Sequence, residues 1–145
     1  MRFMMLLKAN EDTEAGVLPS TEVLAGMGDL MADMAKAGVL LAGDGLKPSS
    51  QGKRVKFTDG KITSVTDGPF TESKELIAGF CTIEVDTWAE VLQWSERFAQ
   101  VAREGESEIR PLYEVCDFPS EILPPEEAAR EQALRDELQR KSTAR

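Results

Sequence analysis

The residues best suited to chemistry in this sequence are carboxylates placed beside glycines. Asp44 stands between Gly43 and Gly45 directly after an apolar run, and Asp67 begins the tetrad Asp67-Gly68-Pro69-Phe70. A carboxylate that is partly withdrawn from water has a raised pKa and can then exchange a proton near neutral pH. The sequence contains no histidine, so acid–base work would fall to carboxylates assisted by Lys or Arg. We therefore predict Asp44 and Asp67 as the catalytic candidates.

Both carboxylates also have a purely structural interpretation. Asp44 can be a turn residue bonded to nearby backbone N–H groups, and Asp67 can fix its own turn in the same way. In the tetrad, Gly68 permits close approach of the backbone and Pro69 restricts the angles around it. Phe70 can fill space in the core. The residue types leave the structural and the catalytic interpretations open.

A second group of residues is suited to holding a ligand. Phe70 and the polar residues that follow it can form the mouth of a pocket, with Lys74 as an electrostatic partner. Arg110 and Tyr113 fall on the last predicted strand, where they can point into a cavity and bind an anionic or phenolic molecule. Alternatively, the stretch after Phe70 is only a solvated loop. Arg110 and Tyr113 can likewise be ion-paired or exposed at the sheet edge. The predicted ligand-binding residues are Phe70, Glu72, Lys74, Arg110 and Tyr113.

Other kinds of chemistry find little support in the sequence. The pair Gly43 and Gly45 lacks the third glycine and the following helix of a dinucleotide site, and no Gly-x-Ser-x-Gly elbow occurs. Cys81 and Cys116 have no metal-type spacing, so we expect them to be reduced core thiols. We expect no cofactor and no metal.

Charge and hydropathy narrow the partners and the location. The net charge is −9, from 17 basic and 26 acidic residues, which disfavours binding to nucleic acid or to anionic lipid. The apolar start of the chain, residues 1–8, is too short for a membrane span or a signal peptide. We therefore expect a cytoplasmic protein with no nucleic-acid or membrane partner.

The hydrophobic pattern predicts alternating strands and helices. Two segments have apolar residues at helical spacing, which predicts two helices. A third helix is predicted where two prolines are followed by two glutamates, at residues 124–127. The remaining segments alternate in polarity or form short apolar runs, which predicts strands. Asp59-Gly60 marks a hairpin turn. The predicted strands are residues 2–8, 39–42, 76–85 and 107–116 with a hairpin at 53–67, and the predicted helices are residues 20–37, 87–104 and 124–140.

This order predicts an α+β protein of the split βαβ, ferredoxin-like plan with an inserted β-hairpin. Its antiparallel sheet would be covered by two helices on one face. The strands at residues 2–8 and 76–85 are apolar on both faces, so the uncovered face needs a partner, because exposing it would cost about 25 cal/mol per Å² of apolar surface. We therefore expect a homodimer built by two-fold pairing of sheets.

Three stretches carry a resemblance to a known family. They are residues 38–46 (Gly-Val-Leu-Leu-Ala-Gly-Asp-Gly-Leu), residues 66–75 around the Asp-Gly-Pro-Phe tetrad, and residues 78–80 (Ala-Gly-Phe). Together with the closing strand at 108–112 they resemble the DGPF family of YCII-related proteins over roughly residues 2–116. The predicted domain covers residues 1–119, followed by a helical extension at 120–145.

The resemblance implies a ferredoxin-like fold in a dimeric α+β barrel and a cytoplasmic bacterial protein. In the wider YCII group a His and an Asp near a pocket are a proposed acid–base pair, and one member type acts in chloroaromatic breakdown. Asp44 would match the acidic half of that pair, but this chain has no His to complete it. Some members are similar to, or encoded beside, partners of extracytoplasmic-function sigma factors.

Two hypotheses of function follow from the sequence. The first is a dimeric protein that binds a small organic ligand at the sheet and dimer interface, with cofactor-free isomerase-like or lyase-like proton transfer. The second is a noncatalytic regulatory or interaction module that associates with a sigma factor. The sequence leaves open whether the chain is an enzyme.

Overall fold

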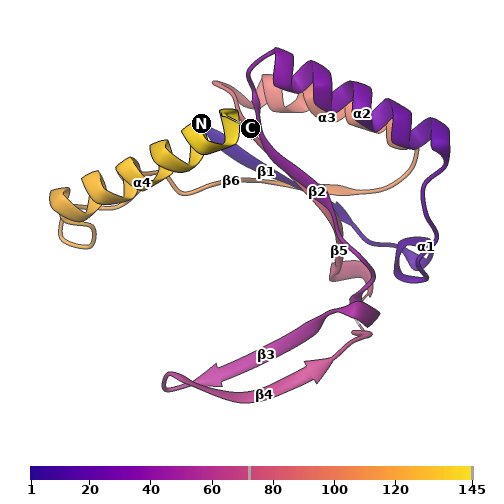
Figure 1. Ribbon diagram of the computed structural model, residues 1–145, viewed down its shortest axis with the longest axis horizontal. Helices are drawn as coiled ribbons and strands as arrows, with labels where there is room; N and C mark the ends of the chain where they lie inside the picture. Colours follow the sequence, from indigo (N-terminus) through magenta and orange to yellow (C-terminus); the bar gives the residue numbers. More distant parts are fainter. Residues whose placement is uncertain (72, 145) are drawn as a thin grey trace.

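A four-stranded antiparallel sheet forms the centre of the molecule in the computed structural model, which describes residues 1–71 and 73–144. The sheet contains β1 (Arg2–Lys8), β2 (Leu40–Gly45), β5 (Ile77–Glu84) and β6 (Ser107–Pro111) in the order β2-β5-β1-β6. Strands β1 and β5 are central in the sheet, and the helical connections lie on one face of it (Figure 1). This order is the split βαβ arrangement, so the predicted α+β, ferredoxin-like plan is confirmed.

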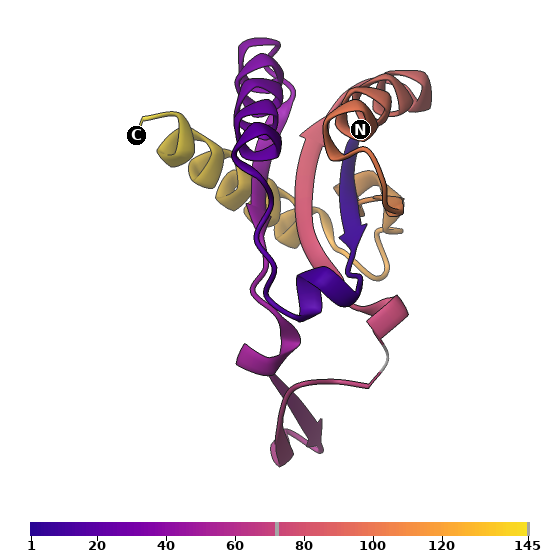
Figure 2. The same ribbon diagram turned by 90° about the vertical axis from the view of Figure 1, so that its right-hand side faces the viewer.

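Two helices cover one face of the sheet and supply the core with it (Figure 2). Ser20 caps α2 (Thr21–Lys36) by accepting from the Val23 N–H, and Thr87 caps α3 (Trp88–Ala102) by accepting from the Glu90 N–H. Such caps satisfy backbone donors that the first turn leaves free. The buried core joins apolar residues of both helices to the strands: Phe3, Met5, Leu30, Met34, Ile83, Val85 and Val91.

Close packing of α2 against α3 depends on the small residue Gly26. A Cβ on Gly26 would come within 2.9 Å of Val101 on α3, whereas a Cβ on Gly28 would meet nothing within 4 Å. Gly26 therefore permits helix–helix contact, while Gly28 has no packing requirement.

The opposite face of the sheet is not covered by helices α2 and α3, and we call it the open face. The strand register places residues there in two rows, each crossing all four strands. The centre of both rows is mainly apolar, and three of the four row ends carry charge. The first row is Asp44, Phe80, Leu6 and Glu108, and the second is Ala42, Thr82, Met4 and Arg110.

The inserted hairpin projects from one end of the sheet (Figure 1). It consists of β3 (Lys53–Thr58) and β4 (Lys61–Asp67), paired with each other and not with the four-stranded sheet. Every residue of both strands is exposed. Its base is closed by a hydrogen bond of 3.1 Å from the Gly68 N–H to the Gly52 carbonyl. Single-turn helices flank this base, at Ser49–Gln51 (η1) and Ser73–Glu75 (η2).

Three local differences from the sequence-based expectation stand out. The polar stretch after β1 contains a short helix, α1 (Glu11–Glu14), which Asn10 and Thr13 cap reciprocally. The last strand ends at Pro111, well before the predicted end at residue 116. The next residues turn into η3 (Val115–Asp117), because the Asp117 carboxylate accepts from the Glu114 N–H and stabilises the turn. Cys116 therefore lies exposed in η3 and not in the core.

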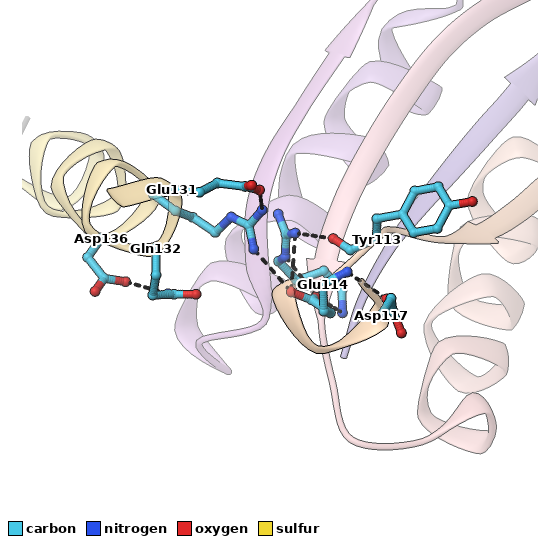
Figure 3. A network of polar contacts seen from close by, with 8 residues as sticks. Tyr113, Glu114, Asp117, Glu131, Gln132 and Asp136 are labelled. Atoms are coloured by element: carbon cyan, nitrogen blue, oxygen red, sulfur yellow. Dashed lines mark hydrogen bonds and ion pairs between the residues drawn. The ribbon is translucent and has the colours of Figure 1, made fainter. Parts of the chain in front are cut away.

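The C-terminal helix α4 (Pro125–Thr143) is held to the body by charge (Figure 3). Glu114 accepts from the Arg2 guanidinium at 3.0 Å and from the Arg135 guanidinium at 3.1 Å, so it joins β1 to α4. Arg135 also bonds Glu131 within the helix at 2.9 Å. No residue of α4 is fully buried. Within residues 1–71 and 73–144, neither this helix nor any other is apolar enough over sufficient length to cross a membrane.

Candidate functional site

Asp44 lies on the open face near the end of β2. It pairs in register with Phe80, and its side chain is exposed in the single chain. The partial withdrawal from water that we expected from the sequence is therefore absent in the single chain. Asp44 has no ion pair among the described residues. A second molecule seated on the open face would be needed to remove water from it.

Asp67 occupies a different environment, at the end of the hairpin. It forms an ion pair with Lys53 across the two strands, and both side chains remain largely exposed. Ion pairs of this kind contribute little to stability, about 0–1 kcal/mol. Asp67 therefore belongs to the two-stranded hairpin sheet, whereas Asp44 belongs to the four-stranded sheet.

The predicted ligand-binding residues are dispersed rather than gathered in one site. Arg110 shares the open face with Asp44 but lies three strands away, roughly 14 Å at the usual strand spacing. Lys74 is exposed in η2. Glu72 lies outside the described residues.

Tyr113 is not on a strand, which corrects the sequence-based expectation. Because β6 ends at Pro111, Tyr113 lies in the connection to η3, where 74% of its surface is exposed and its ring packs against Phe118. Figure 3 shows its side chain directed away from the carboxylates of the ion network. Tyr113 therefore does not join Arg110 in a shared cavity within one chain.

Among the predicted ligand-binding residues that the structure describes, only Phe70 lines a cleft. The cleft has a volume of about 520 Å³, is open to solvent and lies at the base of the hairpin. Its walls come from the segment after β2, from the end of α1, and from the start of β5. The residues that line it are Glu14, Leu46, Lys47, Pro48, Ser49, Gln51, Gly52, Phe70, Glu75, Leu76 and Ile77.

Ser49 holds three segments together beside this cleft. Its backbone N–H donates to Glu14 Oε1 at 3.1 Å, and its hydroxyl donates to Glu14 Oε2. The same hydroxyl oxygen accepts from the Phe70 N–H at 3.1 Å. Helix α1, η1 and the Asp-Gly-Pro-Phe turn are thus linked through one side chain.

Gly68 explains why the tetrad contains glycine at its second position. A Cβ at this position would lie 1.8 Å from the Ser49 carbonyl oxygen and 2.6 Å from the Ser49 carbonyl carbon. Both are backbone atoms, so no side-chain movement could relieve the overlap. The tetrad can lie against η1 only because residue 68 has no side chain, and Phe70 reaches the cleft as a result.

Phe70 contacts the hairpin through one cation–π interaction. The Arg54 guanidinium lies 4.1 Å from the centroid of the Phe70 ring. Cation–π contacts of this type add about 0.5–1 kcal/mol at exposed sites. The ring therefore forms an apolar part of the cleft wall and joins that wall to the hairpin.

The charges around the cleft are partly compensated. Lys8 donates a hydrogen bond of 3.3 Å to Glu75, which raises the pKa of Lys8. Lys47 adds a second positive charge at the rim. Within residues 1–71 and 73–144, no group of three or more His, Cys, Asp or Glu side chains is arranged to hold a metal ion.

The cysteines have no role at this site. Burial raises the pKa of the Cys81 thiol to about 11, so it remains protonated at neutral pH and is a poor nucleophile. Cys116 lies in η3, in the segment that leads to α4.

Sequence reasoning did not identify Glu14 and Ser49. Both lie in polar stretches that show no catalytic spacing and no hydrophobic period. One signal was available, because Asn10 and Thr13 have the spacing of reciprocal caps and indicate a short helix ending near Glu14. Its contact with Ser49 spans 35 residues and could not be read from local patterns.

Comparison with known proteins identifies the family. No curated protein matches the chain. Among solved structures, the 5-chloro-2-hydroxyhydroquinone dehydrochlorinase TftG of Burkholderia phenoliruptrix AC1100, in complex with 2,5-dihydroxybenzoquinone, aligns with a TM-score of 0.43 and 13% identity, over 79% of this chain and 95% of that chain. A family model described as the YCII-related domain matches residues 1–116. That match covers most of the chain and ends before α4, and the chain belongs to the YCII-related family.

Proposed function

We propose that this chain binds a small organic molecule in the cleft at the base of the hairpin, and that it does so as a homodimer paired through the open face. The observation that carries the proposal is the position of Phe70, the last residue of the tetrad, in the wall of the cleft. A mainly apolar lining with a few placed polar groups is typical of small-molecule sites.

The open face and the hairpin support the homodimer. Leu6 and Phe80 at the centre of the open face are only half-buried in one chain. On the hairpin, Phe57 and Ile62 are paired across the strands and are 75% and 67% exposed. A second copy that covers these surfaces would remove apolar area from water on both molecules.

Asp44 is the proposed acid–base residue. It precedes Leu46 of the cleft by two residues, roughly 7 Å along an extended chain. Dimerisation over Phe80 would withdraw its carboxylate from water and so favour proton transfer. The ion pair of Asp67 with Lys53 favours a structural role for that residue.

A matched pair of substitutions tests the ligand site. Phe70→Ala removes an apolar part of the cleft wall, whereas Leu92→Ala removes an exposed apolar side chain of α3, outside the cleft and outside the proposed dimer interface. Binding of small ring compounds would be followed by protein-observed NMR. We expect at least a tenfold loss of affinity in Phe70→Ala and none in Leu92→Ala. Equal binding by both variants, with perturbed signals outside residues 46–52 and 70–77, would contradict the proposal.

A second substitution separates binding from chemistry. Asp44→Asn should leave ligand affinity within about twofold of the wild type while abolishing catalysed deuterium exchange at a carbon acid in the bound molecule. Unchanged exchange in Asp44→Asn would remove Asp44 from the proposed chemistry and leave the binding proposal standing.

The alternative function is an interaction module that associates with a sigma factor. The observation that favours it is α4, which lies outside the family match and exposes Leu134 and Leu138. Co-purification with a purified extracytoplasmic-function sigma factor, compared between the full chain and a form lacking residues 121–145, tests this function. Retention by the full chain and loss on truncation would support it, and absence of binding by both would exclude that partner.

A further inference from the structure

Glu14 offers the cleft a carboxylate in a fixed orientation. It ends α1, whose short length is stabilised by the reciprocal Asn10 and Thr13 caps. Ser49 binds both of its oxygens, through the backbone N–H at 3.1 Å and through the hydroxyl. The side chain is half-buried at the cleft wall.

The hydrogen-bond directions determine what Glu14 can still do. The Ser49 hydroxyl has one proton, and the Phe70 N–H already occupies an acceptor position on its oxygen. The hydroxyl proton therefore points to Glu14, and bonds aligned in this way polarise one another. An ionised carboxylate has about four acceptor positions, of which Ser49 uses two. The remaining positions can only accept hydrogen bonds from a donor.

The rest of the cleft restricts the shape and charge of that donor. Leu46, Leu76 and Ile77 line it together with the Phe70 ring, so a flat apolar body is favoured. Glu75 places a second carboxylate at the same cleft, bonded to Lys8. The lining carries two carboxylates, Glu14 and Glu75, against one ammonium group, Lys47, so its charge is net negative and disfavours an anionic ligand.

We propose that Glu14 is the ligand-anchoring residue of the cleft and that the cleft selects neutral ring compounds bearing a hydroxyl group that donates to Glu14. This inference rests on the proposed binding function and adds the ligand class to it. Asp44 stays on the open face as the proton-transfer residue, whereas Glu14 only accepts a hydrogen bond and fixes orientation.

Three probe molecules test the ligand class without any change to the protein. Phenol has the ring and the donor, anisole has the ring and the oxygen but no donor, and benzoate has the ring and a negative charge. Dissociation constants would be measured by protein-observed NMR at pH 7. We expect phenol to bind at least about tenfold more tightly than anisole, because it makes a hydrogen bond to a charged group. We expect benzoate to bind most weakly of the three.

Two matched variants assign the preference to one carboxylate. Glu14→Gln removes the charge and should bring phenol within about twofold of anisole. Glu11→Gln changes an exposed carboxylate of the same helix and should leave the ratio unchanged. An unshifted Phe70 amide signal in Glu14→Gln would show that the Asp-Gly-Pro-Phe turn is intact in this variant.

The outcomes separate this inference from the proposed function. If phenol and anisole bind equally in the wild type, or if benzoate binds as tightly as phenol, the inference is wrong while the cleft remains a binding site. If Glu14→Gln and Glu11→Gln give the same ratio as the wild type, Glu14 is not the anchor. If none of the three probes shifts the signals of residues 46–52 and 70–77, both the inference and the proposed cleft fail.

Discussion

At the scale of single residues, the contacts made by Ser49 explain why the tetrad has glycine at residue 68 and how Phe70 is placed. Its hydroxyl bonds Glu14 and the Phe70 N–H, and its carbonyl oxygen occupies the space where a side chain on residue 68 would be. Gly68 and Phe70 are thus fixed by a neighbour distant in sequence. The structural interpretation of the tetrad and the functional one are compatible, because the same packing that requires glycine places the aromatic ring in the cleft.

Substitution of two glycines tests this account. Gly68→Ala should lower the free energy of unfolding by about 2 kcal/mol or more, because a backbone overlap of this kind forces the turn to move. Gly28→Ala is the matched control in open space on α2, and it should raise stability by about 0.5–1 kcal/mol. Both values come from urea denaturation. A Gly68→Ala variant as stable as the wild type would show that the tetrad does not lie against η1.

At the scale of elements, α4 differs from α2 and α3 in what holds it. The two covering helices bury apolar residues, whereas α4 is attached mainly through Glu114 and Arg135. Burial alone would raise the pKa of the Glu114 carboxyl, but hydrogen bonds from Arg2 and the charges of Arg2 and Arg135 hold that pKa below its usual range. The docking of α4 should therefore depend on pH and on salt.

The pH dependence has a definite sign. Because the pKa of Glu114 is lower in the folded chain than in the unfolded chain, its contribution to the docking of α4 is complete above about pH 4.5. The contribution is lost as the pH falls through the lowered pKa of the folded state. We expect amide protection factors of residues 125–143 to fall about fivefold in that window, as for loss of a modest ion pair.

Two variants check that Glu114 is the cause. Glu114→Gln should show the reduced protection already at pH 7. Glu137→Gln removes an ion pair internal to α4, with Lys141, and should keep the protection of the wild type. If Glu114→Gln protects α4 as well as the wild type does, docking depends on other contacts.

The sequence predicted elements better than it predicted their ends or their contacts. Periodicity located both covering helices and the central strands, because those patterns reflect burial along one element. The Asp59-Gly60 turn signal located the hairpin, whose strands are exposed. It missed the end of β6, where Pro111 and the Asp117 cap decide the backbone path. The candidate site was predicted only through Phe70, because Glu14 and Ser49 acquire their roles from a contact between distant segments.

At the scale of the whole molecule, the outline is open on one side. The hairpin and α4 project from opposite ends of the sheet, and both extend away from the layer formed by α2 and α3 (Figure 1). Between them lies the open face with its apolar centre. A second copy is the proposed occupant of the open face, which would bring the hairpin and α4 into or beside the interface.

A charge placed at the centre of the open face tests the dimer. Leu6→Glu should convert a dimer to a monomer at micromolar concentration, because pairing of two such faces would bury unpaired carboxylates. Ala35→Glu, on the exposed side of α2, should leave the mass unchanged. Light scattering measures both. A wild-type mass equal to one chain would contradict the proposed dimer.

The hydrogen bond between Gly52 and Gly68 has a consequence for how this architecture can change. The chain leaves the body and returns to it at neighbouring points, so residues 53–67 form an appendage whose ends are already tied. Insertions, deletions or a grafted peptide within it would leave the pairing of the four central strands untouched. The fold of the central sheet therefore tolerates a different segment at this junction, which makes the junction a splice point for engineering.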